Sequence, residues 1–424
     1  MKEKILMVQP ENKEINRFRR LQINNFAQVT MPYLAAFVDE GYYEITLVDE
    51  YCQRLPYKKR FGLVAITVNT PNATHCYEIS ARFKKNGAKV VMGGPHATLL
   101  PDEVSRYCDY LIVGEAEGTW VQFLDDFRNG YPNKIYKSVE APGLSCLPLP
   151  RWDLLKRNRV MKGAIFATRG CPYNCRYCNL KQIYHNCFRA RPVGDVVLEL
   201  KAIKSKFFVF WDDNLFADKT YAIRLFQEMK PLKSKWAAQA SLRDCMDDDL
   251  LKAAKEAGCL YLFIGIESFS EESLNYAGKN INRVSEYEEI IEKIHRHGIM
   301  VQAGIIFGFD NDSIEVFYKT LEACEQLGID GATVSILTPF PKTPIYGQFK
   351  DEGRLLGSDW AKYNSKTAVV FEPKNMSADE LFEGYNYFRK RFYSVGSFIK
   401  RMKKSRTNII INFFINLGYR MGVR

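Results

Sequence analysis

Short apolar runs alternate with amphipathic stretches over the first 130 residues, which is the pattern of β-strands separated by α-helices. The runs predict five strands, at Lys4–Val8, Glu44–Val48, Leu63–Thr67, Lys89–Met92 and Tyr110–Val113. The stretches between them predict four helices, at Met31–Glu40, Ala73–Lys85, Pro101–Tyr107 and Thr119–Phe127. Residues 1–130 are therefore predicted to form a doubly wound, flavodoxin-like α/β domain whose ligand crevice lies at the carboxyl ends of the strands.

A second alternating unit follows residues 131–160, which are rich in Pro and turn residues and are typical of a surface linker. Its apolar runs predict six strands, at Ala164–Thr168, Phe207–Trp211, Trp236–Ala240, Leu260–Ile264, Val301–Phe307 and Gly331–Ile336. The helices expected between them are Arg191–Ile203, Ala217–Met229, Asp248–Glu256, Val284–His295 and Ile314–Leu327. These units predict a partial (βα)6 barrel of the TIM type over residues 161–346, with its chemistry at the C-terminal ends of the strands. Residues 347–424 are expected to form a helical extension.

The composition and the N-terminal segment of the chain bear on the cellular location of the protein and on the role of its cysteines. A chain of 424 residues with 46% hydrophobic residues has ample material for two or three cores. Its N-terminus lacks a signal-peptide core, and no run reaches the ~20 apolar residues of a membrane span. The sequence therefore predicts a cytoplasmic protein. Its eleven cysteines are an odd number in a large chain without an export signal, which favours thiols and metal ligands over disulfides.

The net charge of +11 comes almost entirely from the C-terminal tail. From Gly384 to Arg424 the chain has ten Lys or Arg residues and no Asp or Glu. The rest is nearly neutral, and the tail shows no nucleic-acid-binding module, so no nucleic-acid partner is expected. The apolar run 409–417 leaves two interpretations open. The tail lies in a membrane interface, as a peripheral contact, or it forms a helix whose apolar face packs on the barrel and whose basic face is solvated.

Three cysteines stand in a C-x3-C-x2-C pattern after the first predicted barrel strand: Cys171, Cys175 and Cys178. Three thiolates this close indicate a metal site. Zinc would need a fourth ligand, for which His185 is the nearest candidate. An iron–sulfur cluster held by three thiolates would instead leave one iron open to a substrate. Cys187 lies close by and is a candidate reactive thiol.

At this motif the sequence resembles the radical S-adenosylmethionine (radical SAM) superfamily, over roughly residues 163–346. The resemblance implies a [4Fe–4S] cluster on the three cysteines and cleavage of S-adenosylmethionine to a 5′-deoxyadenosyl radical. Tyr177 matches the aromatic position that the family packs beside the adenine. The segment with Gly265, Glu267 and Ser268 resembles the family's ribose-contacting segment, and Gly304 lies in the fifth-strand motif that borders the adenine.

The chain departs from this family after the second barrel strand. Many members have Gly-Gly-Glu there, whereas this chain has Asp212, Asp213 and Asn214. Asp212 or Asp213 is therefore the candidate for the methionine amine, although an Asp-Asp-Asn turn equally suits a helix cap. Arg243 either meets the methionine carboxylate through a charge-assisted contact or is an exposed salt-bridge partner.

The loops of the first domain resemble the cobalamin-binding branch of the same superfamily. The positions that match its cofactor loops are Thr67, Asn69, Gly93, Gly94, His96, Gly114 and Glu115. The Asp-x-His-x-x-Gly signature, with which other cobalamin proteins supply an axial histidine to cobalt, is absent. The resemblance therefore implies that the lower face of cobalt has no histidine ligand. This arrangement favours the nucleophilic Co(I) state. The alternative is that the domain binds nothing and its glycines only turn the chain.

The resemblance therefore predicts a cobalamin-dependent radical SAM enzyme. Its leading activity is methylation of an unactivated carbon or phosphorus of a small molecule or lipid, through methylcobalamin and the deoxyadenosyl radical. The alternative keeps both cofactors but carries out cyclisation, oxidation or rearrangement. A third interpretation is a non-catalytic sensor. The complete set of S-adenosylmethionine motifs argues against it, because a sensor would not need them. A flavodoxin- or ferredoxin-type electron donor is expected.

Overall fold

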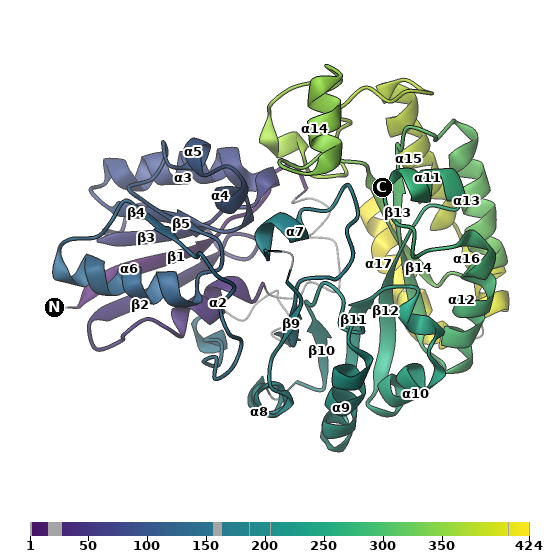
Figure 1. Ribbon diagram of the computed structural model, residues 1–424, viewed down its shortest axis with the longest axis horizontal. Coiled ribbons are helices and arrows are strands. Elements are labelled where there is room, and N and C mark those ends of the chain that lie inside the picture. The colour runs from purple at the N-terminus through teal and green to yellow at the C-terminus, as the bar shows by residue number, and fades with distance from the viewer. Residues whose placement is uncertain are drawn as a thin grey trace.

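The computed structural model describes residues 2–15, 28–155, 163–185, 187–203, 205–405 and 407–423. They form an N-terminal α/β domain, a half-barrel of parallel strands with helices on its outside, and a set of C-terminal helices (Figure 1). The predicted linker ends, and the predicted barrel begins, among residues 156–162, which lie outside the described residues.

The N-terminal sheet has the strand order β2-β1-β3-β4-β5-β6, with all neighbours parallel. Its strands are β1 (Glu3–Gln9), β2 (Tyr43–Asp49), β3 (Leu63–Thr67), β4 (Lys89–Gly93), β5 (Tyr110–Val113) and β6 (Ile135–Lys137). The helices on its faces are α2 (Thr30–Ala35), α3 (Ala73–Lys85), α4 (Pro95–Leu99), α5 (Pro101–Val104) and α6 (Glu117–Asn129). The order reverses between β1 and β3, which places a ligand crevice at their carboxyl ends. The predicted doubly wound domain is confirmed.

Strand β6 corrects the sequence analysis, which placed its residues in a linker. It spans only Ile135–Lys137 at the sheet edge, and only Tyr136 of the three is buried. Three residues with one buried side chain give no readable alternation. The pairing with β5, rather than the local sequence, makes this segment a strand.

The half-barrel is one sheet of six parallel strands in the order β14-β13-β12-β11-β10-β7. Its strands are β7 (Ala164–Ile165), β10 (Phe207–Phe210), β11 (Lys235–Ala240), β12 (Cys259–Glu267), β13 (Met300–Phe307) and β14 (Gly331–Ile336). Its outer helices are α8 (Val193–Ile203), α9 (Lys219–Met229), α10 (Asp248–Glu256), α11 (Glu271–Tyr276), α12 (Tyr287–Arg296) and α13 (Glu315–Gln326). Within the described residues, β7 and β14 do not pair, so the barrel is partial, as expected.

The two faces of the half-barrel are buried to different degrees. Outward side chains such as Phe210 and Trp236 are fully buried under the helices. Inward side chains such as Val209, Gln239 and Phe263 stay half-buried. A closed TIM barrel fills its interior with side chains. The inner face of this half-barrel instead borders open space.

The C-terminal extension joins the two α/β units. It contains α14 (Pro344–Asp351), α15 (Ala378–Phe392), α16 (Val395–Ser405) and α17 (Ile409–Val423). Between α14 and α15, Trp360, Tyr363 and Val370 enter the hydrophobic core of the N-terminal domain. Leu381, Tyr385 and Phe388 of α15 enter the barrel core instead. This extension therefore helps to fix the orientation of the N-terminal domain relative to the barrel.

Helix α17 differs from the expected amphipathic helix. Its buried stripe is polar: the side-chain amide of Asn412 donates to the Asp330 carboxylate (2.8 Å), and that of Asn416 donates to the Asp330 carbonyl (2.9 Å). Asp330 precedes β14 and is fully buried, so it needs such donors. The predicted packing of an apolar face on the barrel is found only in part: Ile411, Ile415 and Tyr419 face the inside of the half-barrel, whereas most of the large apolar side chains of α17 are exposed.

Candidate functional site

The cysteine triad lies on the loop after the short strand β8 (Thr168–Arg169), which pairs with β9 (Arg189–Ala190). Cys171, Cys175 and Cys178 line a cavity of about 190 Å³, which we call the cysteine-loop cavity. Burial raises the pKa of all three thiols, that of Cys178 to about 12. Metal binding must therefore displace protons at this loop and supply positive charge to the thiolates.

The arrangement of the triad fits the demands of an iron–sulfur cluster. In such a cluster each thiolate binds a different iron. Three half-buried thiols around one cavity fit that demand, with the cavity left for a ligand of the remaining iron.

The two adjacent aspartates have separate places in the structure. Asp212 is fully buried and accepts hydrogen bonds from the Ala167 backbone amide (3.1 Å) and the Thr168 hydroxyl (2.6 Å), so it holds the strand that leads into the cysteine loop. Asp213 accepts a hydrogen bond from the Gly170 backbone amide (3.1 Å) and, unlike Asp212, also lines the cysteine-loop cavity. Burial raises the pKa of Asp213 to about 6. Of the two predicted candidates for the methionine amine, only Asp213 faces the space where a ligand would bind.

A buried ion pair that the sequence analysis missed faces the same cavity. Lys279 Nζ lies 3.2 Å from Glu267 Oε1, and both side chains are 10% exposed. Burial lowers the pKa of Lys279, but the negative charge of Glu267, together with the neighbouring cysteines when they are ionised, outweighs this effect and raises the pKa. The pairing register of β12 with β13 shifts between Gly265 and Glu267, and Glu267 has φ of 66°. This bulge aims the Glu267 carboxylate into the cavity.

The other predicted S-adenosylmethionine residues divide between the cavity wall and its support. Tyr177 and Gly265 line the cavity, whereas Ser268 and Gly304 are not among its lining residues. The Ser268 hydroxyl accepts from the Ser270 backbone amide (3.1 Å), which makes it part of the turn after β12. A Cβ on Gly304 would lie 2.9 Å from the ring of Phe263, which does line the cavity. Gly304 therefore leaves room for that ring.

Arg243 lies outside the cavity. Its guanidinium is 3.3 Å from Glu286 Oε2, and its side chain is 51% exposed. Of the two alternatives for this residue, the structure shows the exposed salt bridge. Two lysines line the cavity, Lys181 and Lys279, and of these Lys279 is buried whereas Lys181 is exposed.

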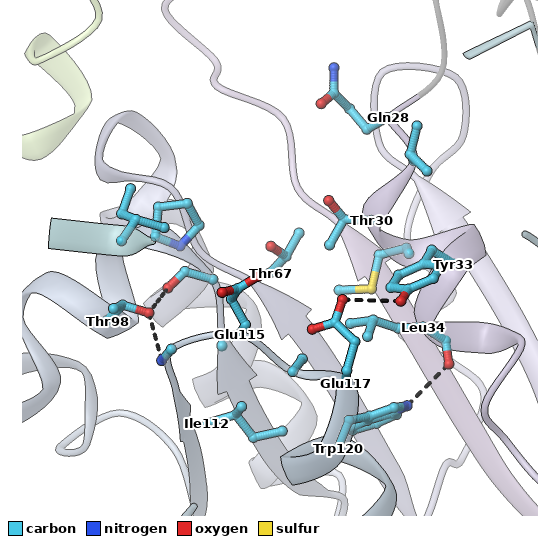
Figure 2. Close-up of a pocket in the computed structure, with 18 of the residues that line it drawn as sticks. Gln28, Thr30, Tyr33, Leu34, Thr67, Thr98, Ile112, Glu115, Glu117 and Trp120 are labelled. Carbon is cyan, nitrogen blue, oxygen red and sulfur yellow. Dashed lines mark hydrogen bonds between the residues drawn. The ribbon is translucent and has the colours of Figure 1, made fainter. Parts of the chain in front are cut away.

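A second cavity, of about 380 Å³, opens between the carboxyl ends of the N-terminal strands and the cysteine loop; we call it the interdomain cavity. Six of the seven predicted cobalamin contacts line it: Thr67, Asn69, Gly93, Gly94, Gly114 and Glu115. Figure 2 shows the Thr98 hydroxyl bridging two of the loops, since it donates to the Gly94 carbonyl and accepts from the Gly114 amide, both at 3.0 Å. Gly94 has φ of 101°, and a Cβ there would lie 2.8 Å from the Thr67 hydroxyl. This bare backbone suits a cofactor that approaches closely.

His96 is the predicted contact that the structure places elsewhere. Its ring is fully buried, with Nδ1 3.2 Å from the Thr70 hydroxyl and the ring packed against Trp360. The short helix α4 begins at Pro95 and turns the side chain of His96 away from the cavity. The chain has five histidines and the structure describes all of them, yet none lines the interdomain cavity.

A charged network ties the two units together at the interdomain cavity. Arg169, two residues before the first cysteine, contacts Glu115 at 2.7 Å and Glu117 at 2.6 Å. Arg189 reaches the other oxygen of Glu115 at 2.5 Å, and the Tyr33 hydroxyl donates to Glu117 at 3.0 Å. Burial raises the pKa of Glu117, but the charge of Arg169 outweighs it and holds the pKa below its usual range. Glu115 therefore joins the domains as well as lining the cavity.

Replacing Arg169 with Met is expected to lower the free energy of unfolding by about 3 to 5 kcal/mol, because it removes the ion-pair partner of the buried Glu117 and leaves the buried Glu115 with Arg189 as its remaining partner. Chemical denaturation of wild type and variant in the same cofactor state measures this difference. Arg151→Met is the matched control, since Arg151 pairs with the exposed Glu40 and Asp153 and should cost less than about 1 kcal/mol. Equal losses in the two variants would contradict a joining role for Arg169.

A third cavity, of about 500 Å³, occupies the hollow of the half-barrel and is called the barrel cavity. Its wall is formed by residues of β10 to β14, by Lys366, and by Ile411, Ile415 and Tyr419 of α17. Most of the lining is aromatic or aliphatic, including Phe207, Leu260 and Met300.

The three cavities adjoin one another. Asp213 lines both the interdomain and the cysteine-loop cavity. Trp211 lines both the interdomain and the barrel cavity, and Gln239 and Phe263 line both the cysteine-loop and the barrel cavity. A ligand in the barrel cavity would therefore lie next to both of the other two. No sequence pattern could have shown this, because the shared residues come from separate strands.

Comparison with known families assigns both α/β units. Residues 28–124 match the B12 binding domain, and residues 165–324 match the radical SAM superfamily. Residues 343–413 match a domain of unknown function, DUF4070.

Characterised relatives extend the match over nearly the whole chain. Bacteriochlorophyllide d C-12(1)-methyltransferase of Chlorobaculum tepidum is 30% identical and covers 98% of this chain and 93% of its own length. Hopanoid C-2 methylase of Rhodopseudomonas palustris is 27% identical over 64% of this chain and 54% of its own length.

Solved structures share the fold. The radical SAM methyltransferase TsrM of Kitasatospora setae, with cobalamin and a [4Fe–4S] cluster bound, superposes with a TM-score of 0.66 at 18% identity, covering 83% of this chain and 78% of TsrM. The enzyme OxsB, with aqua-cobalamin and S-adenosylmethionine bound, superposes with a TM-score of 0.69 at 13% identity, covering 97% of this chain and 72% of OxsB.

Proposed function

The chain belongs to the cobalamin-binding branch of the radical SAM superfamily, and on that premise we propose that it methylates an unactivated carbon of a large, mostly apolar substrate. It is an enzyme whose cofactors are a [4Fe–4S] cluster, S-adenosylmethionine and cobalamin. The observation that carries the proposal is the meeting of the three cavities. It puts one substrate site within reach of both cofactor sites.

Each cofactor site has its own set of residues in this proposal. Cys171, Cys175 and Cys178 hold the cluster, and Asp213 and Lys279 bind the amine and carboxylate of the methionine moiety. When bound, the cluster and S-adenosylmethionine would supply the deoxyadenosyl radical, and cobalamin would supply the cobalt that carries the methyl group. The opposite charges of Asp213 and Lys279 on one cavity wall suit an amino acid. Glu267 orients Lys279 through their ion pair and is placed to meet the ribose diol.

Cobalamin occupies the interdomain cavity in this proposal. The loops that carry Thr67, Gly94 and Gly114 form one wall, and Arg169 and Trp211 form the wall toward the barrel. The indole of Trp211, which is 40% exposed, lines both this cavity and the barrel cavity.

The substrate class follows from the barrel cavity. Its aromatic and aliphatic lining favours an apolar body, and its few polar side chains, Gln239, Tyr261, Gln302 and Thr333 among them, would orient it. The two relatives described above act, by their names, on a bacteriochlorophyllide and a hopanoid. Both are large and apolar, which supports the same class for this chain. A flavodoxin- or ferredoxin-type protein is proposed as the electron donor.

A second candidate function is cyclisation with the same cofactors. Its support is a relative named anaerobic magnesium-protoporphyrin IX monomethyl ester cyclase, from Cereibacter sphaeroides, which is 26% identical over 78% of this chain. The two functions differ in whether a methyl group is consumed.

Anaerobic reconstitution tests the proposal. The protein receives iron, sulfide, cobalamin, S-adenosylmethionine and a strong reductant, and the products and bound cobalamin are quantified. We expect stoichiometric cobalamin with both 5′-deoxyadenosine and S-adenosylhomocysteine, because methyl transfer uses one molecule of S-adenosylmethionine as methyl donor and another as radical source. Deoxyadenosine without S-adenosylhomocysteine would favour the cyclase function. Zinc in place of iron, with neither product, would overturn both.

A further inference from the structure

Helix α17 presents an apolar face to solvent. Six of its side chains are large, apolar and between 38% and 66% exposed: Ile409, Ile410, Phe413, Phe414, Leu417 and Met421. A surface helix of a globular protein normally turns such residues inward. In α17 the inward positions are shared by Ile411, Ile415 and Tyr419, which line the barrel cavity, and by Asn412 and Asn416, which donate hydrogen bonds to Asp330. The hydrogen bonds to Asp330 therefore fix the orientation of α17 and leave its apolar face exposed.

The apolar face continues onto α16. The rings of Phe398 and Phe413 lie 6.2 Å apart between the two helices, and those of Phe413 and Phe414 lie 5.6 Å apart. Val395 and Ile399 of α16 are also exposed, at 58% and 49%. We call these exposed side chains of α16 and α17 the tail face. Several adjoining large apolar side chains are more than the single exposed residues that any surface carries.

The charged side chains that α16 and the last turn of α15 expose are basic. Lys400, Lys403 and Lys404 are exposed on α16, on the turns that follow Ile399, and Lys390 and Arg391 are exposed near the end of α15. No Asp or Glu occurs from Gly384 to the end of the sequence. Lys400 pairs with Glu325 of α13. An apolar face with a basic border complements an apolar layer covered by anionic groups, which is the surface of an anionic membrane.

We propose that the tail face docks on the surface of an anionic lipid membrane, with α17 lying in the interface. The helix has 15 residues, or about 22 Å of length, which is too short to cross a bilayer. No helix among the described residues is long and apolar enough to cross one. A second copy of the chain fits the face less well, because it would bring two basic surfaces together without acids between them.

The same helix links the membrane surface to the barrel. Ile411, Ile415 and Tyr419 on its inner side line the barrel cavity, while Phe413 and Phe414 on its outer side belong to the tail face. Docking would hold one wall of the barrel cavity against the lipid. A substrate dissolved in the membrane would then reach the cavity without crossing water; this last step rests on the proposed function, whereas docking itself does not.

Vesicle co-sedimentation tests the docking with the reconstituted full chain. The probes are vesicles of phosphatidylcholine alone and of phosphatidylcholine mixed with phosphatidylglycerol. We expect binding to the mixed vesicles, weaker binding at high salt, and little binding to phosphatidylcholine. Phe413→Glu/Phe414→Glu should weaken binding at least about 100-fold, and Lys403→Gln/Lys404→Gln by roughly 30-fold.

Two controls keep the result specific to the tail face. Tyr131→Glu/Val139→Glu changes two apolar residues that are 70% and 81% exposed on the N-terminal side of the chain, and it should leave binding unchanged. Thermal unfolding must show that the tail variants fold, which their exposure favours. Equal loss of binding in the control, or no binding by wild type, would overturn the proposal. So would a wild-type dimer that the phenylalanine variant converts to monomer, since a second copy would then cover the face.

Discussion

Cys175→Ala is expected to reduce formation of 5′-deoxyadenosine to background, by at least about 1,000-fold, which corresponds to about 4 kcal/mol or more of lost barrier reduction. Cys175 lies between the other two cysteines on the loop and lines the cavity with them. Two thiolates cannot replace three around a cluster that already lacks a fourth protein ligand. Iron content and the amount of deoxyadenosine per protein, measured after anaerobic reconstitution, check this expectation.

Cys187→Ala is the matched control, because Cys187 is a half-buried cysteine close to the triad in sequence. Its thiol lies 3.9 Å from the Phe188 carbonyl, and it is not among the residues that line the cysteine-loop cavity. The variant should keep its iron and its deoxyadenosine formation. A Cys187→Ala enzyme that retains iron but loses all product would show instead that this thiol takes part in the chemistry.

Lys279→Met is expected to weaken S-adenosylmethionine binding by at least about 100-fold, or about 2.7 kcal/mol. The substitution removes the ammonium that faces the cysteine-loop cavity and leaves the Glu267 carboxylate buried without its partner at 3.2 Å. Breaking a buried pair in this way costs about 3 to 5 kcal/mol, so part of the loss will also show as lower stability. Equilibrium dialysis on reconstituted protein of measured iron content gives the dissociation constant.

Arg243→Met tests whether Arg243 contacts the methionine carboxylate, which the sequence left open, or only forms the exposed salt bridge that the structure shows. Arg243 is half exposed and pairs with Glu286 outside the cavity, so its loss should change binding less than about twofold. Lys279→Arg keeps the charge and should retain part of the affinity. If Arg243→Met weakens binding strongly and Lys279→Met does not, the methionine carboxylate lies where the sequence-based alternative put it, and the role proposed for Lys279 is wrong.

Predicted site residues were misplaced where the local sequence motif and the tertiary contacts of the residue point to different positions. His96 sits in a glycine-rich loop that otherwise lines the interdomain cavity, but the turn into α4 points its ring at Trp360, which lies far along the chain in the C-terminal extension. The Asp212-Asp213 pair was ambiguous because adjacent residues point in opposite directions after a strand. Only the positions of β7 and the cysteine loop show that Asp212 supports the backbone and Asp213 faces the cavity.

The sequence alone determined the order of the two α/β units, most of their strands and the cysteine triad that we propose as the ligands of the iron–sulfur cluster. Those features depend on short-range patterns: apolar periodicity sets the strands, and the spacing of Cys171, Cys175 and Cys178 within one loop sets the ligand group. The tertiary structure alone decided what meets across long separations. Arg169 meets Glu115, Lys279 meets Glu267, Trp211 joins two cavities, and α17 turns its apolar side outward because Asp330 requires the amides of its polar side. Buried charges and polar groups select their partners by proximity in the folded chain, and linear spacing does not encode that proximity.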